Sequence, residues 1–150
     1  MATSTWFQKT LSLPRKARGC HLVTDEILKQ VPEIKTFKIG MANFFIQHTS
    51  ASLTINENCD SDVRKDMEMM LNKLVPESTK FIHDAEGDDD MPGHVKSSLF
   101  GVSLNIPITS GSLNLGTWQG IWLCEHRNSG VQRHYFYRSL TSIFLTIIRE

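Results

Sequence analysis

The sequence predicts an α+β domain built on a largely antiparallel β-sheet sandwich, with two or three helices packed against it. The chain has 150 residues, enough for a single domain with its own hydrophobic core. Many short stretches alternate apolar and polar residues, as strands do, whereas few stretches show the longer period of a helix. No internal repeat or low-complexity linker divides the chain, so we expect one domain over residues 1–150.

The strands are predicted from alternation, because successive side chains of a strand point to opposite faces. The most regular case is Val102, Leu104, Ile106 and Ile108, which share one face. In chain order, the predicted strands cover residues 6–13, 37–39, 43–48, 53–57, 102–108 and 113–115, the last continuing through 117–127.

Two helices are predicted from capping residues and apolar spacing. A short one starts at Thr24 or Asp25 and ends at Pro32. The longest covers about 61–75, with Asp60 as its N-cap. Its apolar stripe at helical spacing contains Val63, Met67, Met70, Leu71 and Leu74.

A third helix is predicted over about 93–100, because Pro92 suits a first helical turn and Gly101 suits a C-terminal stop. On this helix we expect Val95 and Leu99 to face the core. His94, Ser97 and Ser98 would then form a polar stripe, since residues three and four apart stack on one face.

The composition excludes several classes of function. Lysine and arginine number 16, as do aspartate and glutamate, and this zero net charge argues against a nucleic-acid partner. The most apolar stretch, Leu140–Ile148, is shorter than the roughly 20 residues needed to span a membrane. Three widely spaced cysteines without a CxxC motif favour a reducing compartment. We therefore expect a cytoplasmic protein with no nucleic-acid and no membrane partner.

Charge is unevenly distributed despite this balance. Residues 57–90 contain eleven acidic and four basic residues, so the segment is strongly negative. Such a segment faces solvent, binds a cation, or contacts the basic surface of a neighbouring subunit.

Three histidines are candidate metal ligands. His48, His83 and His94 lie at the ends of predicted elements, beside small polar residues. Neutral imidazole is the commonest metal ligand, and carboxylates are plentiful nearby. The spacing matches no recognised zinc motif, however, so the alternative is three ordinary structural histidines.

Carboxylates are a second group of candidate cation ligands. Residues 84–90 are acidic, but position 12 of a loop starting at Asp84 is Val95, whereas a calcium-binding EF-hand requires glutamate there. A solvated loop, or a loop supplying oxygen ligands for magnesium, fits better. Glu57 shares a strand face with Leu53 and Ile55, so it either points inward toward a partner or reaches water at the strand end.

Three basic residues are candidates for anion binding. Lys96, Arg127 and Arg133 can bind a phosphate, with ordinary surface placement as the alternative. Cys124 alternates with bulky strand residues and is predicted to lie in the core, not to act as a nucleophile.

Four separated motifs resemble the YjbQ family, also called the secondary thiamine-phosphate synthase family. The resemblance covers about residues 6–133, in order. Its motifs are residues 47–53 (QHTSASL), 55–58 (INEN), His83 with 90–98 (DMPGHVKSS), and 116–119 (GTWQ), of which the last is the most specific.

This resemblance implies a YjbQ-like α+β fold that assembles as a homotrimer, with a polar pocket near a subunit interface. In that pocket His48, His83 and His94 would gather around a divalent metal, magnesium or zinc. The implied activity is a weak or secondary thiamine-phosphate synthase, a transferase that joins a pyrimidine-methyl diphosphate to a thiazole phosphate and releases pyrophosphate. Expelling pyrophosphate requires neutralisation of its charge by a divalent ion and nearby cations.

The resemblance also suggests roles for individual residues. Glu57 or Asp90 would add an oxygen ligand to the three histidines. The catalytic candidates are Glu57, Asp90, Lys96 and Gln119, and the substrate-binding candidates are Thr49, Ser50, Asn56, Ser97, Trp118 and Arg127.

Two other functions fit the same residues. One is a metal-dependent phosphate-ester hydrolase, and the other is a non-enzymatic trimeric ligand-binding protein, since the sequence shows no recognisable nucleophile–base pair. Residues 134–150 depart from the family's pattern of a single short closing strand. We therefore expect an atypical C-terminal segment that puts folding and trimer assembly at risk.

Overall fold

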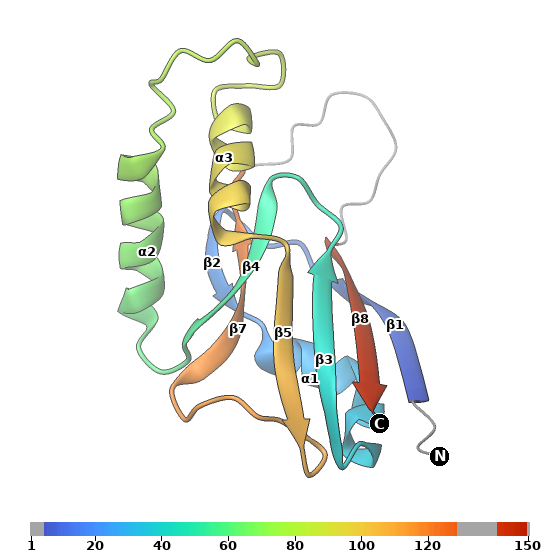
Figure 1. The fold of residues 1–150 in the computed structure, drawn as a ribbon. Coiled ribbons are helices and arrows are strands. Elements are labelled where there is room, and N and C mark those ends of the chain that lie inside the picture. Colours follow the sequence, from blue (N-terminus) through green and yellow to red (C-terminus); the bar gives the residue numbers. More distant parts are fainter. Residues whose placement is uncertain (1–4, 129–140, 150) are drawn as a thin grey trace.

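The computed structural model describes residues 5–128 and 141–149, and Figure 1 shows their arrangement. In chain order, the elements are β1 (Thr5–Leu13), β2 (Gly19–Leu22), α1 (Thr24–Gln30), the 3₁₀ helix η1 (Pro32–Thr36), β3 (Ile39–Ile46), β4 (Ala51–Glu57), α2 (Ser61–Leu74), α3 (Asp90–Phe100), β5 (Ser103–Thr109), β6 (Ser112–Leu113), β7 (Gln119–Glu125) and β8 (Thr141–Arg149).

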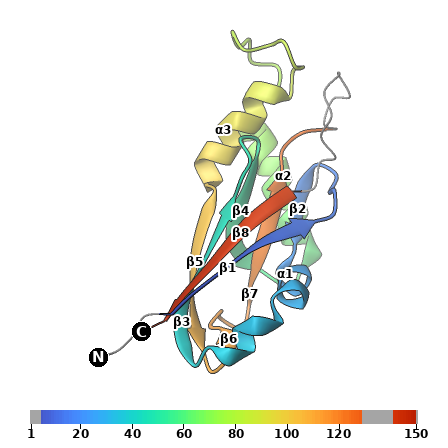
Figure 2. The same cartoon turned by 90° about the vertical axis from the view of Figure 1, so that its right-hand side faces the viewer.

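The strands form two antiparallel sheets. The five-stranded sheet has the order β1-β8-β3-β5-β6, and the three-stranded sheet has the order β2-β7-β4. Helices α2 and α3 stand beside the three-stranded sheet (Figures 1 and 2). The predicted α+β class, with an antiparallel sandwich and packed helices, is confirmed.

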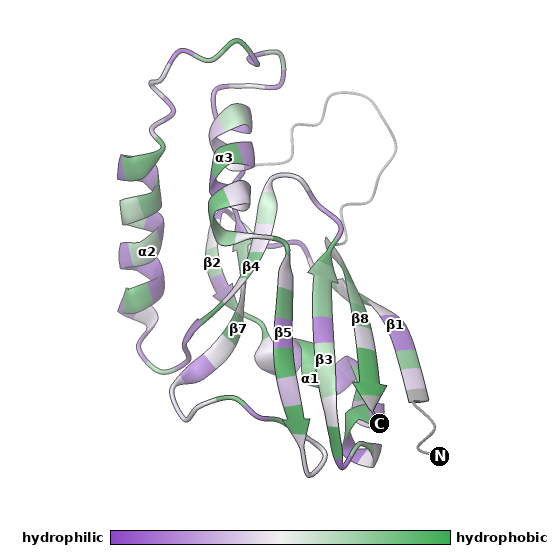
Figure 3. Ribbon diagram, viewed as in Figure 1, coloured by the Kyte–Doolittle hydropathy of each residue, from purple (hydrophilic) through white to green (hydrophobic). Residues whose placement is uncertain are grey.

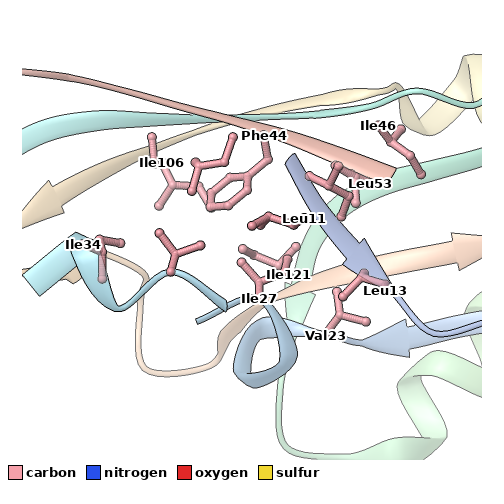
Figure 4. Close-up of a cluster of buried hydrophobic side chains, with 14 of the residues drawn as sticks. Leu11, Leu13, Val23, Ile27, Ile34, Phe44, Ile46, Leu53, Ile106 and Ile121 are labelled. Atoms are coloured by element: carbon pink, nitrogen blue, oxygen red, sulfur yellow. The ribbon is translucent and has the colours of Figure 1, made fainter. Parts of the chain in front are cut away.

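The main core lies between the two sheets and is completed by α1 and η1 (Figure 4). Leu11 of β1, Phe44 of β3 and Ile121 of β7 belong to this cluster, and none is more than 1% exposed. Ile27 of α1 and Ile34 of η1 join it. Each fully buried side chain of this kind contributes about 1.5–3 kcal/mol. Figure 3 shows the alternation of apolar and polar residues along β5 that places one face of the strand on this core.

A second buried layer separates the three-stranded sheet from α2 and α3. Trp122 of β7 is its largest residue, and Cys20 and Cys124 lie beside it. Met67 of α2 and Phe100 of α3 pack against this cluster. Cys124 is thus a core residue, as predicted. Strand β7 therefore serves two layers, with odd-numbered residues facing the main core and even-numbered residues facing the helices.

The C-terminal segment completes the larger sheet. Strand β8 lies between β1 and β3, where Leu145 pairs with Lys9 on one side and Phe44 on the other. Ile143, Leu145 and Ile147 are fully buried. Residues 129–140 lie outside the described residues. Residues 141–149 thus form a regular strand of this sheet, and the departure of the C-terminal segment from the family's pattern stays a prediction.

The two strands predicted over 37–39 and 43–48 are one strand, β3, which continues through Gly40. A side chain could not replace this glycine without a shift, because a Cβ there would lie 2.8 Å from the carbonyl oxygen of Ile148. The glycine thus permits close approach of β8 and does not break the strand.

The helix predictions need two corrections. Helix α3 begins at Asp90, not at residue 93, and its buried face carries Lys96 and Ser97 while Leu99 is 62% exposed. In α2 only Leu71 is buried, and Leu74 is 68% exposed. Helix period predicts which residues share a face, but it does not fix which face meets the sheet.

Asp60 caps α2 as predicted, because its carboxylate accepts a hydrogen bond of 2.8 Å from the N–H of Asp62. We expect Asp60→Ala to lower the free energy of unfolding by about 1 kcal/mol, the usual cost of losing an N-cap. Chemical denaturation measures this change. Asp66→Ala, an acid removed from the exposed middle of the same helix, is the control, and equal losses in the two variants would contradict the capping role.

The outer face of the five-stranded sheet carries exposed apolar side chains. Trp6, Ile39, Met41 and Phe45 project from it, and all are at least 41% exposed. Separately, no helix among the described residues has the length and apolarity required to cross a bilayer.

Candidate metal centre

The candidate centre lies at the N-terminal end of α3. Asp90 opens this helix, where a carboxylate interacts favourably with the helix dipole. His94 follows four residues later and therefore lies on the same face. His83 comes from the loop that precedes the helix, so local chain geometry brings these three side chains together.

The polar atoms of this group lie close together. Nε2 of His83 lies 2.8 Å from Oδ2 of Asp90, and Nε2 of His94 lies 3.5 Å from Oδ1 of the same carboxylate. The three ligand atoms all lie within 4.8 Å of one another. Two ligands of a tetrahedral ion with bonds of about 2.0–2.1 Å stand roughly 3.3 Å apart. The group is therefore compact enough to hold one divalent cation.

The oxygen Oδ2 of Asp90 provides an independent test of this fit. It is buried and has no hydrogen-bond partner among the described residues, even though His83 Nε2 is only 2.8 Å away. A buried carboxylate oxygen without a donor is costly. A cation held between the carboxylate and the imidazole would satisfy this oxygen, so the residues fit a metal.

Arg127 holds the carboxylate from the other side. Its guanidinium donates to Asp90 Oδ1, to Asp89 Oδ2 over 3.1 Å, and to the carbonyl oxygen of Glu86 over 2.9 Å. Asp89 Oδ2 also accepts a 2.7 Å hydrogen bond from the N–H of Asn128. Although burial raises the pKa of Asp89, the Asn128 N–H and the Arg127 charge hold it below its ordinary value. Arg127, a predicted substrate-binding residue, is fully engaged by protein groups.

Close packing fixes the start of α3 against the sheet ends. A Cβ on Gly93 would lie 3.2 Å from Ser50 Cβ and 3.2 Å from Arg127 Cδ. Glycine at this position thus lets the helix approach the residue before β4 and the residues after β7. This close packing places Asp90 beside Arg127, which donates to its Oδ1.

His48 is not part of the close group. Its side chain is exposed, and its Nδ1 accepts a 3.0 Å hydrogen bond from the N–H of Ser50. Thr49 contributes a backbone contact, because its carbonyl oxygen lies 3.0 Å from Nδ1 of His94. The structure therefore brings together two of the three predicted histidine ligands, and it joins to them Asp90, one of the two predicted oxygen ligands.

Lys96 and Ser97 lie on the opposite, buried side of α3. Nζ of Lys96 donates to Oδ1 of Asn72 over 2.6 Å, and Oγ of Ser97 donates to the carbonyl oxygen of Ala51 over 2.8 Å. Burial, reinforced by the charge of Arg18, lowers the pKa of Lys96. Neither side chain reaches the His83–Asp90–His94 group.

A second set of predicted residues lies at the far end of the three-stranded sheet. Asn56, Glu57, Trp118 and Gln119 are found where β4 ends and β7 begins, whereas the metal group lies near the start of β4. The length of β4 separates the two ends by roughly 20 Å. Glu57 there accepts a 3.2 Å hydrogen bond from the N–H of Asp60. Within one chain these four residues do not share a site with the histidines, and their roles stay predictions.

The buried polar residues beside the centre were not predicted from the sequence. His126 is fully buried, and its Nε2 lies 2.8 Å from Oγ of Ser52. Its Nδ1 has no partner among the described residues. The alternation of β7 placed His126 on the face of Trp122, and this was the available signal. No sequence pattern indicated Asp89, because its carboxylate pairs with Arg127 and Asn128, which follow β7.

Burial of His126 predicts a pH-dependent stability. Burial, together with the charges of Lys96 and Arg18, lowers the pKa of His126 to about 4. As pH falls below about 6.5, the unfolded chain binds a proton that the folded protein excludes until about pH 4. The free energy of unfolding therefore falls by about 3 kcal/mol, from this residue alone, as pH falls from about 6.5 to about 4. Above about pH 6.5 this contribution does not change with pH.

The measurement is the free energy of unfolding between pH 4 and pH 7, taken for the natural sequence and for His126→Gln, whose amide cannot titrate. The difference between the two curves isolates the histidine from the carboxylates. Parallel curves over the whole range would contradict the assignment.

An open cavity of about 460 Å³ is lined by Arg18, Glu68, Asn72, Pro76, Glu77 and Asn128. The guanidinium of Arg18, one of the lining residues, donates to Glu68, Asn72, Glu77 and Asn128. Each of these groups pairs with Arg18, and Oε2 of Glu68 has no hydrogen-bond partner among the described residues. We interpret it as a network that ties the loop before β2 to α2 and to the end of β7.

Comparison with known proteins places this chain in a family. The family model described as UPF0047 protein YjbQ-like matches residues 9–142. The chain is 55% identical over 128 residues to UPF0047 protein YjbQ of Escherichia coli O157:H7, covering 85% of this chain and 93% of that protein. It is 41% identical over 133 residues to a UPF0047 protein of Synechocystis sp., covering 88% of this chain and 90% of that protein.

Solved structures agree. A crystal structure of an uncharacterised YjbQ/UPF0047 protein from Clostridium acetobutylicum is 33% identical, with a TM-score of 0.73 and coverage of 94% of this chain and 98% of that one. A YbjQ-like protein of unknown function from Sulfolobus solfataricus P2 has a TM-score of 0.80 at 21% identity, covering 99% and 100%, which shows the shared fold alone. The chain that carries the His83–Asp90–His94 group thus belongs to the YjbQ-like UPF0047 family.

Proposed function

We propose that this protein is a metal-assisted enzyme that acts on a small phosphorylated substrate. The observation that carries the proposal is the group formed by His83, Asp90 and His94, in which a buried carboxylate oxygen lacks a hydrogen-bond donor. Two imidazoles and one carboxylate favour zinc over magnesium, since magnesium prefers oxygen ligands. A bound divalent ion would neutralise negative charge on a phosphorylated substrate.

The chain's own residues would hold and shield this centre. Arg127 fixes the orientation of Asp90 by donating to Oδ1, which leaves Oδ2 for the cation. Asp89 in turn holds Arg127 in place. His83 and His94 remain partly exposed, so a substrate can reach the group from solvent.

As the reaction we propose a weak or secondary thiamine-phosphate synthase, a transferase reaction that releases pyrophosphate from a pyrimidine-methyl diphosphate. The support is the family resemblance together with a site suited to a phosphorylated substrate. Departure of pyrophosphate creates negative charge, and a divalent cation beside the leaving group stabilises it.

The experiment is a synthase assay with both substrates and added zinc, comparing the natural sequence with Asp90→Asn and with Asp88→Asn. Asp88 is an exposed acid in the preceding loop and serves as the matched control. We expect Asp90→Asn and chelator each to abolish turnover and Asp88→Asn to retain it. Equal turnover in all three proteins would refute the proposal.

A phosphate-ester hydrolase is the alternative, because catalytic zinc sites usually have three protein ligands and leave one position open for water. A panel of phosphate esters separates the two reactions. Hydrolysis that depends on Asp90, without synthase turnover, would favour the hydrolase. If neither reaction occurs although the metal binds, a non-enzymatic ligand-binding role becomes the better proposal.

We also propose a homotrimer in a cytoplasmic setting. The exposed apolar side chains Ile39, Met41 and Phe45 on the outer sheet face support self-association, because such surface is unfavourable in water. The described cysteines are free thiols, which suits a reducing compartment. Light scattering on a Phe45→Lys variant tests the assembly, and an unchanged trimer would place the interface elsewhere.

A further inference from the structure

One peptide group contacts two of the histidines. It joins Thr49 to Ser50, in the loop that leads into β4. Its carbonyl oxygen, from Thr49, lies 3.0 Å from Nδ1 of His94, and its N–H, from Ser50, lies 3.0 Å from Nδ1 of His48. A carbonyl can only accept a hydrogen bond and an amide N–H can only donate one. The two contacts therefore determine which ring nitrogens carry protons.

His94 must carry its proton on Nδ1, because this atom donates to the Thr49 carbonyl. In the neutral ring, Nε2 then has a free lone pair, and it points into the group with Asp90 Oδ1 3.5 Å away. Histidines that bind metals commonly donate their other ring N–H to a carbonyl in this way. The peptide thus prepares His94 as a ligand.

His48 has the opposite arrangement. Its Nδ1 accepts from Ser50, so this atom is bare and Nε2 carries the proton. Binding a metal through Nε2 would move that proton to Nδ1. There it would point at the Ser50 N–H, and two hydrogen-bond donors would face each other. His48 also lies outside the close group of His83, Asp90 and His94. Its exposed Nε2–H can donate a hydrogen bond but cannot ligate.

We propose that the Thr49–Ser50 peptide fixes His94 and His48 in opposite tautomers, making His94 a metal ligand and His48 a hydrogen-bond donor to an anionic substrate oxygen. The second half of this inference rests on the proposed function, since it takes a phosphorylated substrate as the anion. The three histidines predicted from the sequence as metal ligands thereby take two roles: His48 leaves the metal set and joins the groups that contact substrate.

The tautomers can be measured without metal or substrate. In ¹⁵N-labelled metal-free protein, two-bond ¹H–¹⁵N correlation spectra show which ring nitrogen is protonated. Comparison with the spectra of His48→Asn and His94→Asn assigns the signals. We expect a bare Nδ1 in His48 and a protonated Nδ1 in His94. A protonated Nδ1 in His48 would overturn the proposal.

The same two variants are matched for the binding test. Asparagine can keep a short contact with the peptide in each case, but it lacks any group at the Nε2 position. By calorimetry, we expect zinc affinity to fall more than about 100-fold in His94→Asn and to stay unchanged in His48→Asn. Inorganic phosphate should bind zinc-loaded His48→Asn about 10- to 100-fold more weakly than the natural sequence. In His48→Gln, whose amide N–H reaches near the Nε2 position, phosphate affinity should partly return.

The outcomes separate this inference from the proposed function. Equal loss of zinc in His48→Asn and His94→Asn would make His48 a ligand and overturn the inference. Unchanged phosphate affinity in His48→Asn would remove its role as donor. If the natural sequence binds no zinc, the proposed function fails, and the spectra still decide whether one peptide sets two opposite tautomers.

Discussion

Replacing Arg127 with methionine is expected to lower the free energy of unfolding by about 3–5 kcal/mol, the cost of leaving a buried charge without its partner. Asp89 and Asp90 are 7% and 1% exposed, and the Arg127 guanidinium donates to both. Methionine keeps the aliphatic length but leaves two adjacent carboxylates to repel each other. Urea denaturation at neutral pH measures the loss.

Arg127→Lys is the control, because it retains the charge but cannot donate to two carboxylates in a fork. We expect a smaller loss for lysine than for methionine. A saturating zinc concentration should restore part of the stability of Arg127→Met, since a cation at Asp90 replaces some of the missing positive charge. A change below about 1 kcal/mol in Arg127→Met would show that the pair contributes little net stability.

Leu145→Ala in β8 is expected to cost about 2–5 kcal/mol, the usual range for removing a fully buried leucine side chain. Leu145 is 0% exposed and lies between β1 and β3. Since β1 pairs only with β8 among the described strands, weakening β8 also loosens the N-terminal strand.

The matched control is Thr146→Ala, the next residue, whose side chain lies on the outer face and accepts a 3.2 Å hydrogen bond from Gln8. This bond is exposed, so we expect a loss below about 1 kcal/mol. Thermal unfolding of both variants checks the difference. Similar losses in the two variants would mean that β8 does not have its inner face on the core.

Local periodicity predicted most of the fold, because alternation in β5 and the Asp60 cap of α2 depend on residues close in sequence. The position of β8 in the sheet was not predictable in this way, since it depends on pairing between residues about 100 positions apart in the chain. The continuity of β3 through Gly40 has the same origin, because only the approach of β8 explains the glycine. Leu99 was misplaced because periodicity does not identify the surface that a helix covers.

In the candidate site, too, the contacts between residues close in sequence were predictable and the contacts between distant residues were not. His83, Asp90 and His94 lie within a dozen residues, so sequence analysis could propose them as neighbours. Arg127 was expected to bind substrate, but the end of β7 brings it to Asp90 instead. The separate orientations of His48 and His94 depend on one backbone peptide, which no residue-type pattern reveals.

The pairing of β1 with β8 also bears on how the chain could be re-engineered. Thr5 lies directly opposite Arg149, so the start of β1 and the end of β8 lie together at one corner of the sheet (Figure 2). A short glycine-rich linker could join these positions, and new termini could open in the exposed loop at residues 84–88. Such a circular permutant would keep every strand neighbour, and it would separate the segment bearing His83 from the segment bearing Asp90 and His94.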